Sequence, residues 1–149
     1  MRNQTSLSYK FVEYIPDSLE DGMMYISISF ATVVHKCCCG CGNEVITPLS
    51  PTDWKLVFDG QTVSLDPSIG NWSFNCQSHY WIKQNQIIWA RQWSQEEINA
   101  GRAYDRLAKK TYLDNKCDRT VSDDNSCNEH QSIGFWGRLK RWLFDRSLG

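Results

Sequence analysis

Five cysteines and two histidines in two short segments most restrict how this chain can fold. His35–Gly42 reads HKCCCGCG, and Cys76–Trp81 reads CQSHYW. Residues 1–10 lack the apolar core of an export signal, so we expect the thiols to lie in the reducing cytoplasm, where disulfides are rare. The seven cysteines are odd in number and Cys37–Cys39 are adjacent, which suits metal binding better than disulfide pairing. The sequence therefore predicts a metal site.

The cysteine cluster must curl to hold one ion. If residues 35–41 were extended, they would span roughly 20 Å at about 3.3 Å per residue, which is too far for a single metal. Gly40 and Gly42 interrupt the cluster, and glycine adopts the positive φ angles of tight turns without steric cost. We therefore expect a compact loop here.

Such a loop can supply zinc with the four thiolates of a tetrahedral structural site. The ligands predicted on this basis are Cys37, Cys39, Cys41 and Cys76. Two alternatives stay open. A C-x-x-C-G knuckle would use Cys38 with Cys41, and His79 is a further candidate ligand. Cys117 and Cys127 lie in polar sequence and are predicted to be bystanders.

Length and charge limit the class of protein. The 149 residues are 41% hydrophobic, enough for one domain with a core. The formal net charge of −1 gives no general attraction to nucleic acid or anionic membrane. No stretch approaches the ~20 apolar residues of a membrane span, and no run of bases accompanies the aromatic residues. We expect neither nucleic-acid binding nor a membrane span.

Residues 11–93 show the patterns of strands and hairpins. MYISISF (24–30) alternates with a period of two, which is typical of a half-buried strand. WKLVFDG (54–60) runs into a turn and TVSL (62–65) returns, while QNQ (84–86) separates two further strands. These patterns predict an α+β fold: a β-rich, zinc-stabilised domain of antiparallel hairpins with a C-terminal helix.

The helix begins after Ser94, which forms a capping box with Glu97, and covers about residues 95–113. It carries an apolar stripe that we expect to pack on the sheet, comprising Ala100, Ala103, Tyr104, Leu107 and Ala108. The β-rich zinc domain is thus predicted to be residues 1–113.

The rest of the chain divides into a linker and a tail. Residues 114–132 carry five acids and two bases with few apolar residues, which predicts a flexible linker. Residues 133–149 are cationic and amphipathic, with Trp136, Leu139 and Leu143 on one stripe, and are predicted to form a short helix. We expect this helix to dock on its own domain or on a protein partner rather than on a membrane.

Three motifs together are similar to those of a small bacterial cysteine-cluster family of formally unknown function. They are H-x-C-x-C-G-C from His35, P-S-I-G-N-W from Pro67 and C-x-S-H-Y-W-I from Cys76, within about residues 9–93. The family tolerates a non-cysteine at the position of Cys38, which favours Cys37, Cys39 and Cys41 as the functional set. Its members resemble proteins encoded beside bacterial ubiquitin-like, activating-enzyme and conjugating-enzyme genes. The resemblance implies a peptidase that matures or removes a bacterial ubiquitin-like modifier, with that modifier and its enzymes as partners.

A serine site is the favoured catalytic arrangement. Ser68 follows Pro67, which fixes the backbone, and precedes Gly70 and Asn71, whose N–H groups could hold an oxyanion. Ser68 is then the nucleophile and His79 the general base, beside a structural zinc. Ser78 is adjacent to His79, so in a strand the two point to opposite faces and do not form a dyad.

Other roles remain open. His35 is a second candidate base, and Asp66 and Glu44 are the candidate acids to orient the histidine. In a metallopeptidase, two cysteines and His79 would leave an open zinc position for water, with Glu44 as base. A zinc-bearing adaptor that binds the conjugation machinery without chemistry is the non-catalytic alternative.

Among the seven tryptophans, Trp72 and Trp81 are predicted to contribute to substrate binding. A sheet edge with aromatic pockets beside it is one way in which proteins recognise an extended peptide. The competing interpretation is that these side chains pack the core of the sheet.

Overall fold

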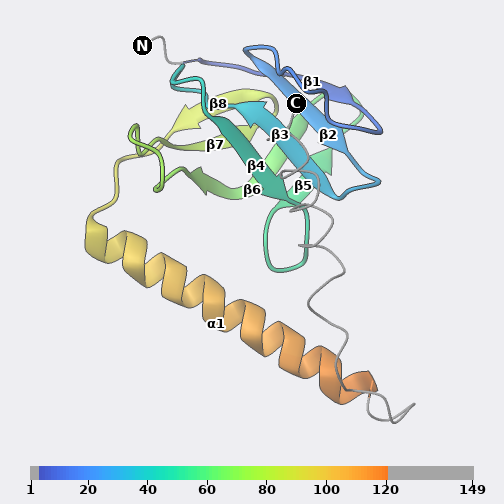
Figure 1. Cartoon of the computed structure of the whole chain (residues 1–149), viewed down its shortest axis with the longest axis vertical. Helices are drawn as coiled ribbons and strands as arrows, with labels where there is room; N and C mark the ends of the chain where they lie inside the picture. Colours follow the sequence, from blue (N-terminus) through green and yellow to red (C-terminus); the bar gives the residue numbers. More distant parts are fainter. Residues whose placement is uncertain (1–3, 121–149) are drawn as a thin grey trace. The chain divides into compact units, whose positions relative to one another are not determined.

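The computed structural model describes residues 4–120, with side chains as far as residue 117 (Figure 1). The predicted tail helix of residues 133–149, most of the predicted linker and Cys127 lie outside the described residues. The strands are β1 (Ser8–Phe11), β2 (Met23–Ser27), β3 (Thr32–Lys36), β4 (Glu44–Pro48), β5 (Lys55–Phe58), β6 (Val63–Gly70), β7 (His79–Lys83) and β8 (Gln86–Trp89). The helix α1 is Gln95–Thr120. The predicted α+β, β-rich class is confirmed.

The first sheet has the order β1-β2-β3-β4, in which β1 is parallel to β2 and the other pairs are antiparallel. β2 is shorter than the sequence alternation suggested. It ends at Ser27, and the following turn leaves Ile28 62% and Phe30 41% exposed. The residues of β2 and β3 are buried on both faces because Leu19, with other residues before β2, covers the outer face.

The second sheet has the order β5-β6-β7-β8 and is antiparallel throughout. Both predicted hairpins of this sheet are present. Asp59 accepts hydrogen bonds from the N–H groups of Gln61 and Thr62 in the first turn. Gln84 and Asn85 have positive φ angles of 48° and 63° in the second, as a tight turn between twisted strands requires.

The two sheets enclose one core and are joined at both edges. The core contains Met24, Ile26, Leu65, Tyr80 and Ile82 among others, all with essentially no exposure. An isolated bridge between Ser6 and Gln86 extends the pairing of β8 to the N-terminal segment. A second bridge, between Leu49 and Trp54, links the end of β4 to the start of β5. The β-rich domain is therefore a closed, two-sheet structure.

The helix starts as predicted and continues further. The Ser94 hydroxyl accepts the N–H of Glu97 at 3.3 Å, and the Glu97 carboxylate accepts the N–H of Ser94 at 2.8 Å. α1 extends to Thr120, so it includes the first residues of the segment predicted to be a linker. The predicted stripe is largely exposed: Tyr104 is 73% and Leu107 is 64% exposed, whereas Ile98 is buried.

That difference has a physical reason, since three of the five stripe residues are alanines and offer little apolar area to bury. The chain divides into two compact units, residues 1–109 and 110–149, and α1 runs from the first into the second. The predicted domain boundary at residue 113 stays a prediction. In the described part of the chain, no helix has the length and apolar character needed to span a bilayer.

Candidate active site and metal site

Four thiols from two distant segments meet in a cluster that can hold a metal ion. Cys37, Cys39 and Cys41 lie in the loop between β3 and β4, and Cys76 lies in the loop between β6 and β7. Their sulfur atoms all lie within 4.8 Å of one another. The distances from Cys37 Sγ are 3.4 Å to Cys39 and 3.9 Å to Cys76, and Cys41 Sγ lies 3.7 Å from Cys76 Sγ.

These separations suit a tetrahedral metal. With metal–sulfur bonds of about 2.3 Å, the sulfurs of a tetrahedral zinc site are about 3.8 Å apart. The loop reaches this geometry by curling, because Gly40 and Gly42 have φ angles of 78° and 82°. The Cys37 N–H also donates to the Asn43 carbonyl at 2.8 Å and closes the loop at its base. The donor set therefore fits a closed four-sulfur site.

Cys38 is not part of this cluster. Its side chain is fully buried in the core and interacts with Tyr80, and burial raises the pKa of the thiol to about 12. The Cys41 thiol behaves differently. Desolvation would raise its pKa, but hydrogen bonds from the Asn43 N–H and the neighbouring cysteines outweigh that effect and lower the pKa to about 7. Burial instead raises the pKa of the Cys37 and Cys39 thiols, so these two would lose their protons only when a metal binds.

Two buried polar side chains support the cluster from behind. Ser78 Oγ lies 3.1 Å from Cys37 Sγ and accepts the Asn71 Nδ2 donor at 2.9 Å. Because Asn71 fills the acceptor role of the hydroxyl, the hydroxyl proton is available to the Cys37 sulfur. Hydrogen bonds of this kind fix the position of metal ligands.

Ser68 and His79 form a second polar site on neighbouring strands. Ser68 Oγ lies 3.0 Å from His79 Nε2. On the other side of the ring, His79 Nδ1 lies 3.1 Å from the carbonyl oxygen of Arg91. A carbonyl can only accept, so Nδ1 must carry the proton. Nε2 of the neutral ring is then the acceptor of the Ser68 hydroxyl proton.

A bulge in β6 brings the serine to this position. Leu65 is opposite Ile82 and Ile69 is opposite Tyr80, so β6 contains two more residues than β7 between these pairs. The extra residues belong to the segment 66–68, whose Asp66–Pro67 peptide bond is cis. Bulges re-aim side chains next to functional sites, and this one places Ser68 beside His79.

Alternation along β7 separates the two sites. Ser78 and Tyr80 point toward the cysteines and the core, whereas His79 and Trp81 point to the other face. His79 is only 4% exposed. The thiol cluster and the Ser68–His79 pair therefore lie on opposite sides of one strand.

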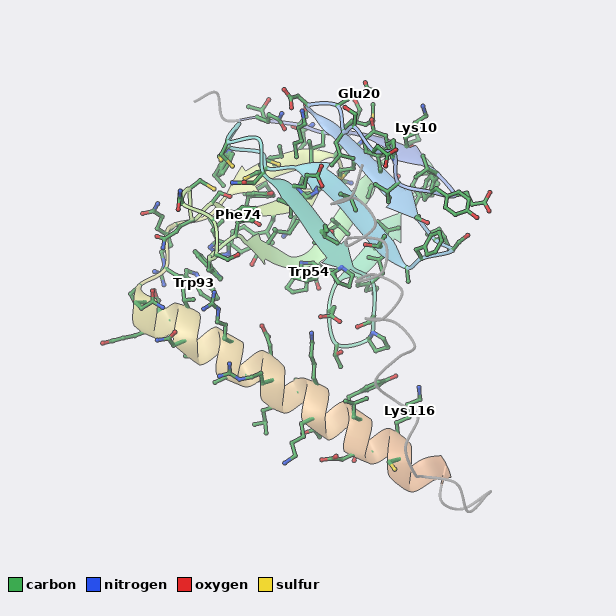
Figure 2. The ribbon with its side chains drawn as sticks, viewed as in Figure 1. Lys10, Glu20, Trp54, Phe74, Trp93 and Lys116 are labelled. Atoms are coloured by element: carbon green, nitrogen blue, oxygen red, sulfur yellow. The ribbon has the colours of Figure 1, made fainter. Side chains whose placement is uncertain are left out.

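Three tryptophans surround the His79 ring. Its centroid lies 5.0 Å from Trp72, 5.6 Å from Trp81 and 5.0 Å from Trp93. Trp72 and Trp93 are stacked, with centroids 5.4 Å apart and an interplanar angle of 22°. Trp93 lies just before α1 (Figure 2). Trp72 also requires glycine at position 70, since a Cβ there would lie 2.4 Å from its ring.

A family model described as "Bacterial ubiquitination-like system serine protease (BubE)" matches residues 11–90, more than half of the chain. The chain belongs to the BubE family. Comparisons with curated proteins and with solved structures gave no match. The resemblance inferred from the three sequence motifs is thereby confirmed at the level of the family.

The BubE match contains the four clustered cysteines as well as Ser68 and His79. Arg91 and Trp93 lie immediately beyond it. Both were missed by sequence reasoning, and for different reasons. Arg91 acts through its carbonyl, which every residue possesses, so no residue type marks it. Trp93 is conspicuous as an aromatic residue, but nothing in the spacing relates it to His79.

Several sequence hypotheses about this BubE member need correction. His79 was a candidate metal ligand, but both ring nitrogens face Ser68 and Arg91 rather than the thiols. Asn71 was expected to offer its N–H to an oxyanion, but that N–H donates to the Ser78 carbonyl at 2.9 Å. Neither Asp66 nor Glu44 takes the orienting position next to His79, which the Arg91 carbonyl occupies.

His35, the second candidate base, lies in the core. Its Nε2 is 3.0 Å from Tyr80 Oη, and its Nδ1 has no partner among the described residues. Burial lowers the pKa of His35 to about 4, so the ring is neutral at pH 7. Glu44 is exposed on β4, where it lies opposite Lys36 of β3 in the strand register. The structure thus places neither His35 nor Glu44 beside Ser68.

Proposed function

We propose that this chain is a serine-type peptidase or isopeptidase that cleaves at the C-terminal tail of a bacterial ubiquitin-like modifier. The observation that carries the proposal is the hydrogen-bonded series Ser68 Oγ, His79 Nε2, His79 Nδ1 and Arg91 carbonyl, with distances of 3.0 Å and 3.1 Å. A nucleophile, a base and an oriented base are the parts that acyl transfer needs. The BubE family description names the same class of enzyme and the same kind of system.

The reaction follows from the positions of the protons. Ser68 Oγ attacks the carbonyl carbon of the scissile bond while its proton passes to His79 Nε2. His79 then gives that proton to the leaving amine nitrogen, the C–N bond breaks, and the acyl group remains as an ester on Ser68. Water attacks the ester and gives a proton to His79 Nε2. As the ester C–O bond breaks, His79 returns that proton to Ser68 Oγ, and the released carboxylic acid ionises. Throughout, Nδ1–H donates to the Arg91 carbonyl and holds the ring in place.

The Arg91 carbonyl replaces the carboxylate of the familiar triad. A neutral acceptor fixes the tautomer and the ring orientation, but it stabilises the imidazolium less than an anion does. The tryptophans around His79 exclude water, which strengthens the remaining hydrogen bonds.

Zinc is the metal that we propose for Cys37, Cys39, Cys41 and Cys76, since four thiolates at these separations suit its tetrahedral preference. When bound, zinc would tie the loop after β3 to the loop before β7 as a structural cross-link. A site closed by four cysteines leaves no position for a catalytic water. This favours the serine mechanism over the metallopeptidase alternative.

Cleavage of a cognate bacterial ubiquitin-like protein, extended beyond its terminal glycine, tests the proposal. The wild-type chain should release the extension. Ser68→Ala should reduce the rate by about a thousandfold or more, because the nucleophile is lost. His79→Ala should reduce it similarly. Both variants should keep wild-type metal content, because neither side chain is a predicted ligand.

Three results would contradict parts of this scheme. Intact substrate in a stable complex with the wild-type chain would indicate a non-catalytic adaptor. Activity that persists in Ser68→Ala but disappears on chelation without unfolding would indicate a metallopeptidase. Loss of metal from His79→Ala would indicate that His79 is a ligand.

A further inference from the structure

β6 has an unpaired stretch around Ser68, on the side of the strand where β5 pairs with its first half. β5 pairs only with Val63–Asp66 of β6, and its first residue, Lys55, is opposite Asp66. β6 continues to Gly70, and its last two residues pair with β7 on the other side. Among the described residues, no strand pairs with Pro67–Gly70 on the β5 side. The β6 edge, by which we mean Pro67–Gly70, is therefore open to an added strand.

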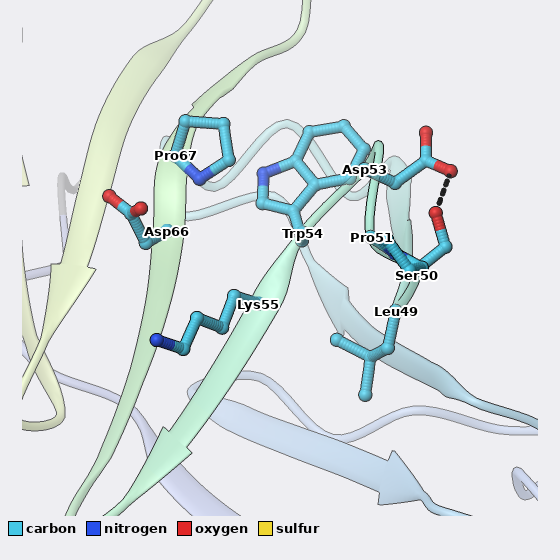
Figure 3. Close-up of a pocket in the computed structure, with 8 residues that line it drawn as sticks. All are labelled: Leu49, Ser50, Pro51, Asp53, Trp54, Lys55, Asp66 and Pro67. Carbon is cyan, nitrogen blue, oxygen red and sulfur yellow. Dashed lines mark hydrogen bonds between the residues drawn. The ribbon is translucent and has the colours of Figure 1, made fainter. Parts of the chain in front are cut away.

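A pocket lies at the end of this edge, where β5 begins (Figure 3). Its volume is about 480 Å³, and Asp66 and Pro67 form the wall that leads to Ser68. The opposite wall is the loop between β4 and β5. We call this cavity the Trp54 pocket, because the indole of Trp54 lies between the two walls.

The chemistry of the Trp54 pocket is mainly apolar. Leu49, Pro51, Trp54 and Pro67 supply hydrocarbon and ring surface. The charged groups beside these residues have both signs, so they favour neither a cationic nor an anionic ligand. The Lys55 ammonium and the Asp66 carboxylate belong to opposed residues of β5 and β6.

Asp53 is already engaged, because it accepts the Ser50 hydroxyl at 2.6 Å and pairs with Lys109. A large uncharged side chain is therefore the group that this pocket suits best.

One polar atom of the Trp54 side chain, which lines the pocket, lacks a partner. Trp54 Nε1 is buried and makes no hydrogen bond in the described structure. A buried N–H donor is usually satisfied, and leaving it unpaired is costly. The carbonyl of a peptide strand lying beside the β6 edge would satisfy it. This observation points to a peptide ligand independently of the open edge.

We propose that an extended segment of the substrate binds as an additional strand along the β6 edge, with a large apolar side chain in the Trp54 pocket and a main-chain carbonyl accepting from Trp54 Nε1. The inference rests on the proposed peptidase function and adds its mode of substrate selection. From Pro67 to Gly70 the edge spans about 10 Å at about 3.3 Å per residue, so it accommodates about four substrate residues. Main-chain pairing supplies affinity, and the pocket supplies specificity.

Binding to full-length Ser68→Ala protein tests this without relying on cleavage. The probes are fluorescein-labelled hexapeptides of alanine and glycine, in which a single leucine is moved through the six positions and affinity is measured by anisotropy. At one position leucine should bind about tenfold more tightly than alanine, because its buried hydrocarbon is larger. Lysine or glutamate at that position should lose this gain.

N-methylation of the best peptide, one residue at a time, tests the added strand. In an antiparallel or a parallel pair, only alternate residues of a strand bond to a given neighbour. Methylation should therefore weaken binding at alternate positions and leave the intervening positions unaffected. Equal effects at all positions, or none, would overturn the strand model. A charged residue preferred at every position would overturn the assignment of the pocket.

Trp54→Phe removes the unpaired donor and keeps an aromatic ring, and it should weaken the best peptide about fivefold. Trp89→Phe is the matched control, since the Trp89 N–H donates to the Gln4 carbonyl at 3.1 Å in a different part of the domain. It should leave the affinity unchanged. Circular dichroism and metal content show whether each variant is folded, and folded Trp54→Phe with unchanged affinity would contradict the proposed hydrogen bond.

The two proposals fail separately. If the wild-type chain cleaves no substrate but the Ser68→Ala protein shows the leucine preference and the alternating effect, only the catalytic proposal is wrong. If the wild-type chain cleaves the modifier but the hexapeptides show neither pattern, the binding mode is wrong and the protease function stands.

Discussion

Two serines ten residues apart, Ser68 in β6 and Ser78 just before β7, belong to two different sites. Ser68 Oγ contacts His79 Nε2, and Ser78 Oγ contacts Cys37 Sγ and the Asn71 side chain. Both hydroxyls take part in hydrogen bonds, yet only Ser68 faces a base that can accept its proton. Their substitution should therefore affect different properties of the protein.

Ser78→Ala should lower stability and leave the nucleophile in place. The substitution leaves the buried Asn71 Nδ2 without its best acceptor, a loss typically of about 1–3 kcal/mol. Urea unfolding should show this decrease, while cleavage under native conditions persists. Ser68→Ala is the matched control and should unfold at nearly the wild-type urea concentration. A Ser78→Ala protein of normal stability without activity would contradict this assignment.

The sequence alone predicted the site residues whose side chains are metal ligands, nucleophiles or bases. The clustered cysteines, Ser68 and His79 stand in motifs whose chemistry restricts their roles, and the structure brings each set together. The exclusion of Cys38 and the orientation of His79 by a main-chain carbonyl depend on three-dimensional packing. No residue type marks either feature, so the sequence alone left them open.

At the scale of elements, hydrophobic periodicity predicted that strands exist but not where their pairing ends. The alternation in residues 24–30 continues through Ile28 and Phe30, although β2 stops at Ser27. The bulge in β6 was equally hidden, since it depends on the register between β6 and β7. Helix capping was easier to predict, because Ser94 and Glu97 act within one turn.

The start of α1 should make stability depend on pH through Glu97. Hydrogen bonds from Arg91, and then from the Ser94 N–H, lower the pKa of the Glu97 carboxyl to about 2. A lowered pKa in the folded state means that this stabilisation is complete above the ordinary pKa of about 4.5 and is lost as pH falls toward 2.

Glu97→Gln should therefore flatten this acid dependence. Urea midpoints of the variant and the wild type should differ at pH 7 and converge toward pH 3. Glu96→Gln, in the same helical turn, is the matched control and should follow the wild-type curve. Parallel curves for Glu97→Gln and the wild type at all pH values would contradict the role of this carboxylate.

At the scale of the whole molecule, the thiol cluster brings together loops from both sheets. Cys37, Cys39 and Cys41 follow a strand of the first sheet, and Cys76 precedes a strand of the second. Cys41→Ser should lose the metal and much of the folded protein, because metal binding and folding share one free energy. Cys38→Ala is the control and should keep the metal, since its side chain lies in the core outside the cluster.

Elemental analysis of freshly purified, reduced protein measures the metal directly. One zinc ion per chain is expected for the wild type and for Cys38→Ala. Wild-type protein that is folded, active and free of zinc would contradict the structural role. Metal loss from both Cys38→Ala and Cys41→Ser, with retention in Cys39→Ser, would show that the loop uses the alternative knuckle.

We expect the β-rich domain to fold without the C-terminal region. The buried core residues of the two sheets lie between Leu7 and Ile87, and the Ser68–His79 pair and the four cysteines lie within that range. Deletion of residues 114–149 should therefore leave a folded, metal-containing domain that cleaves a short peptide at the wild-type rate. The deletion should weaken binding to a protein partner, because partner binding is the role predicted for the amphipathic residues 133–149.

Circular dichroism, metal content and peptide cleavage measure the first part of this prediction, and binding to the ubiquitin-like protein and its enzymes measures the second. Loss of metal or of peptide cleavage on deletion would mean that the C-terminal region completes the fold or the site. Strong co-sedimentation of the full-length protein with anionic vesicles, absent after deletion, would instead assign the tail to a membrane surface. Since the net charge is only −1 overall and the acidic linker offsets the basic tail, we expect that attraction to be weak at physiological salt.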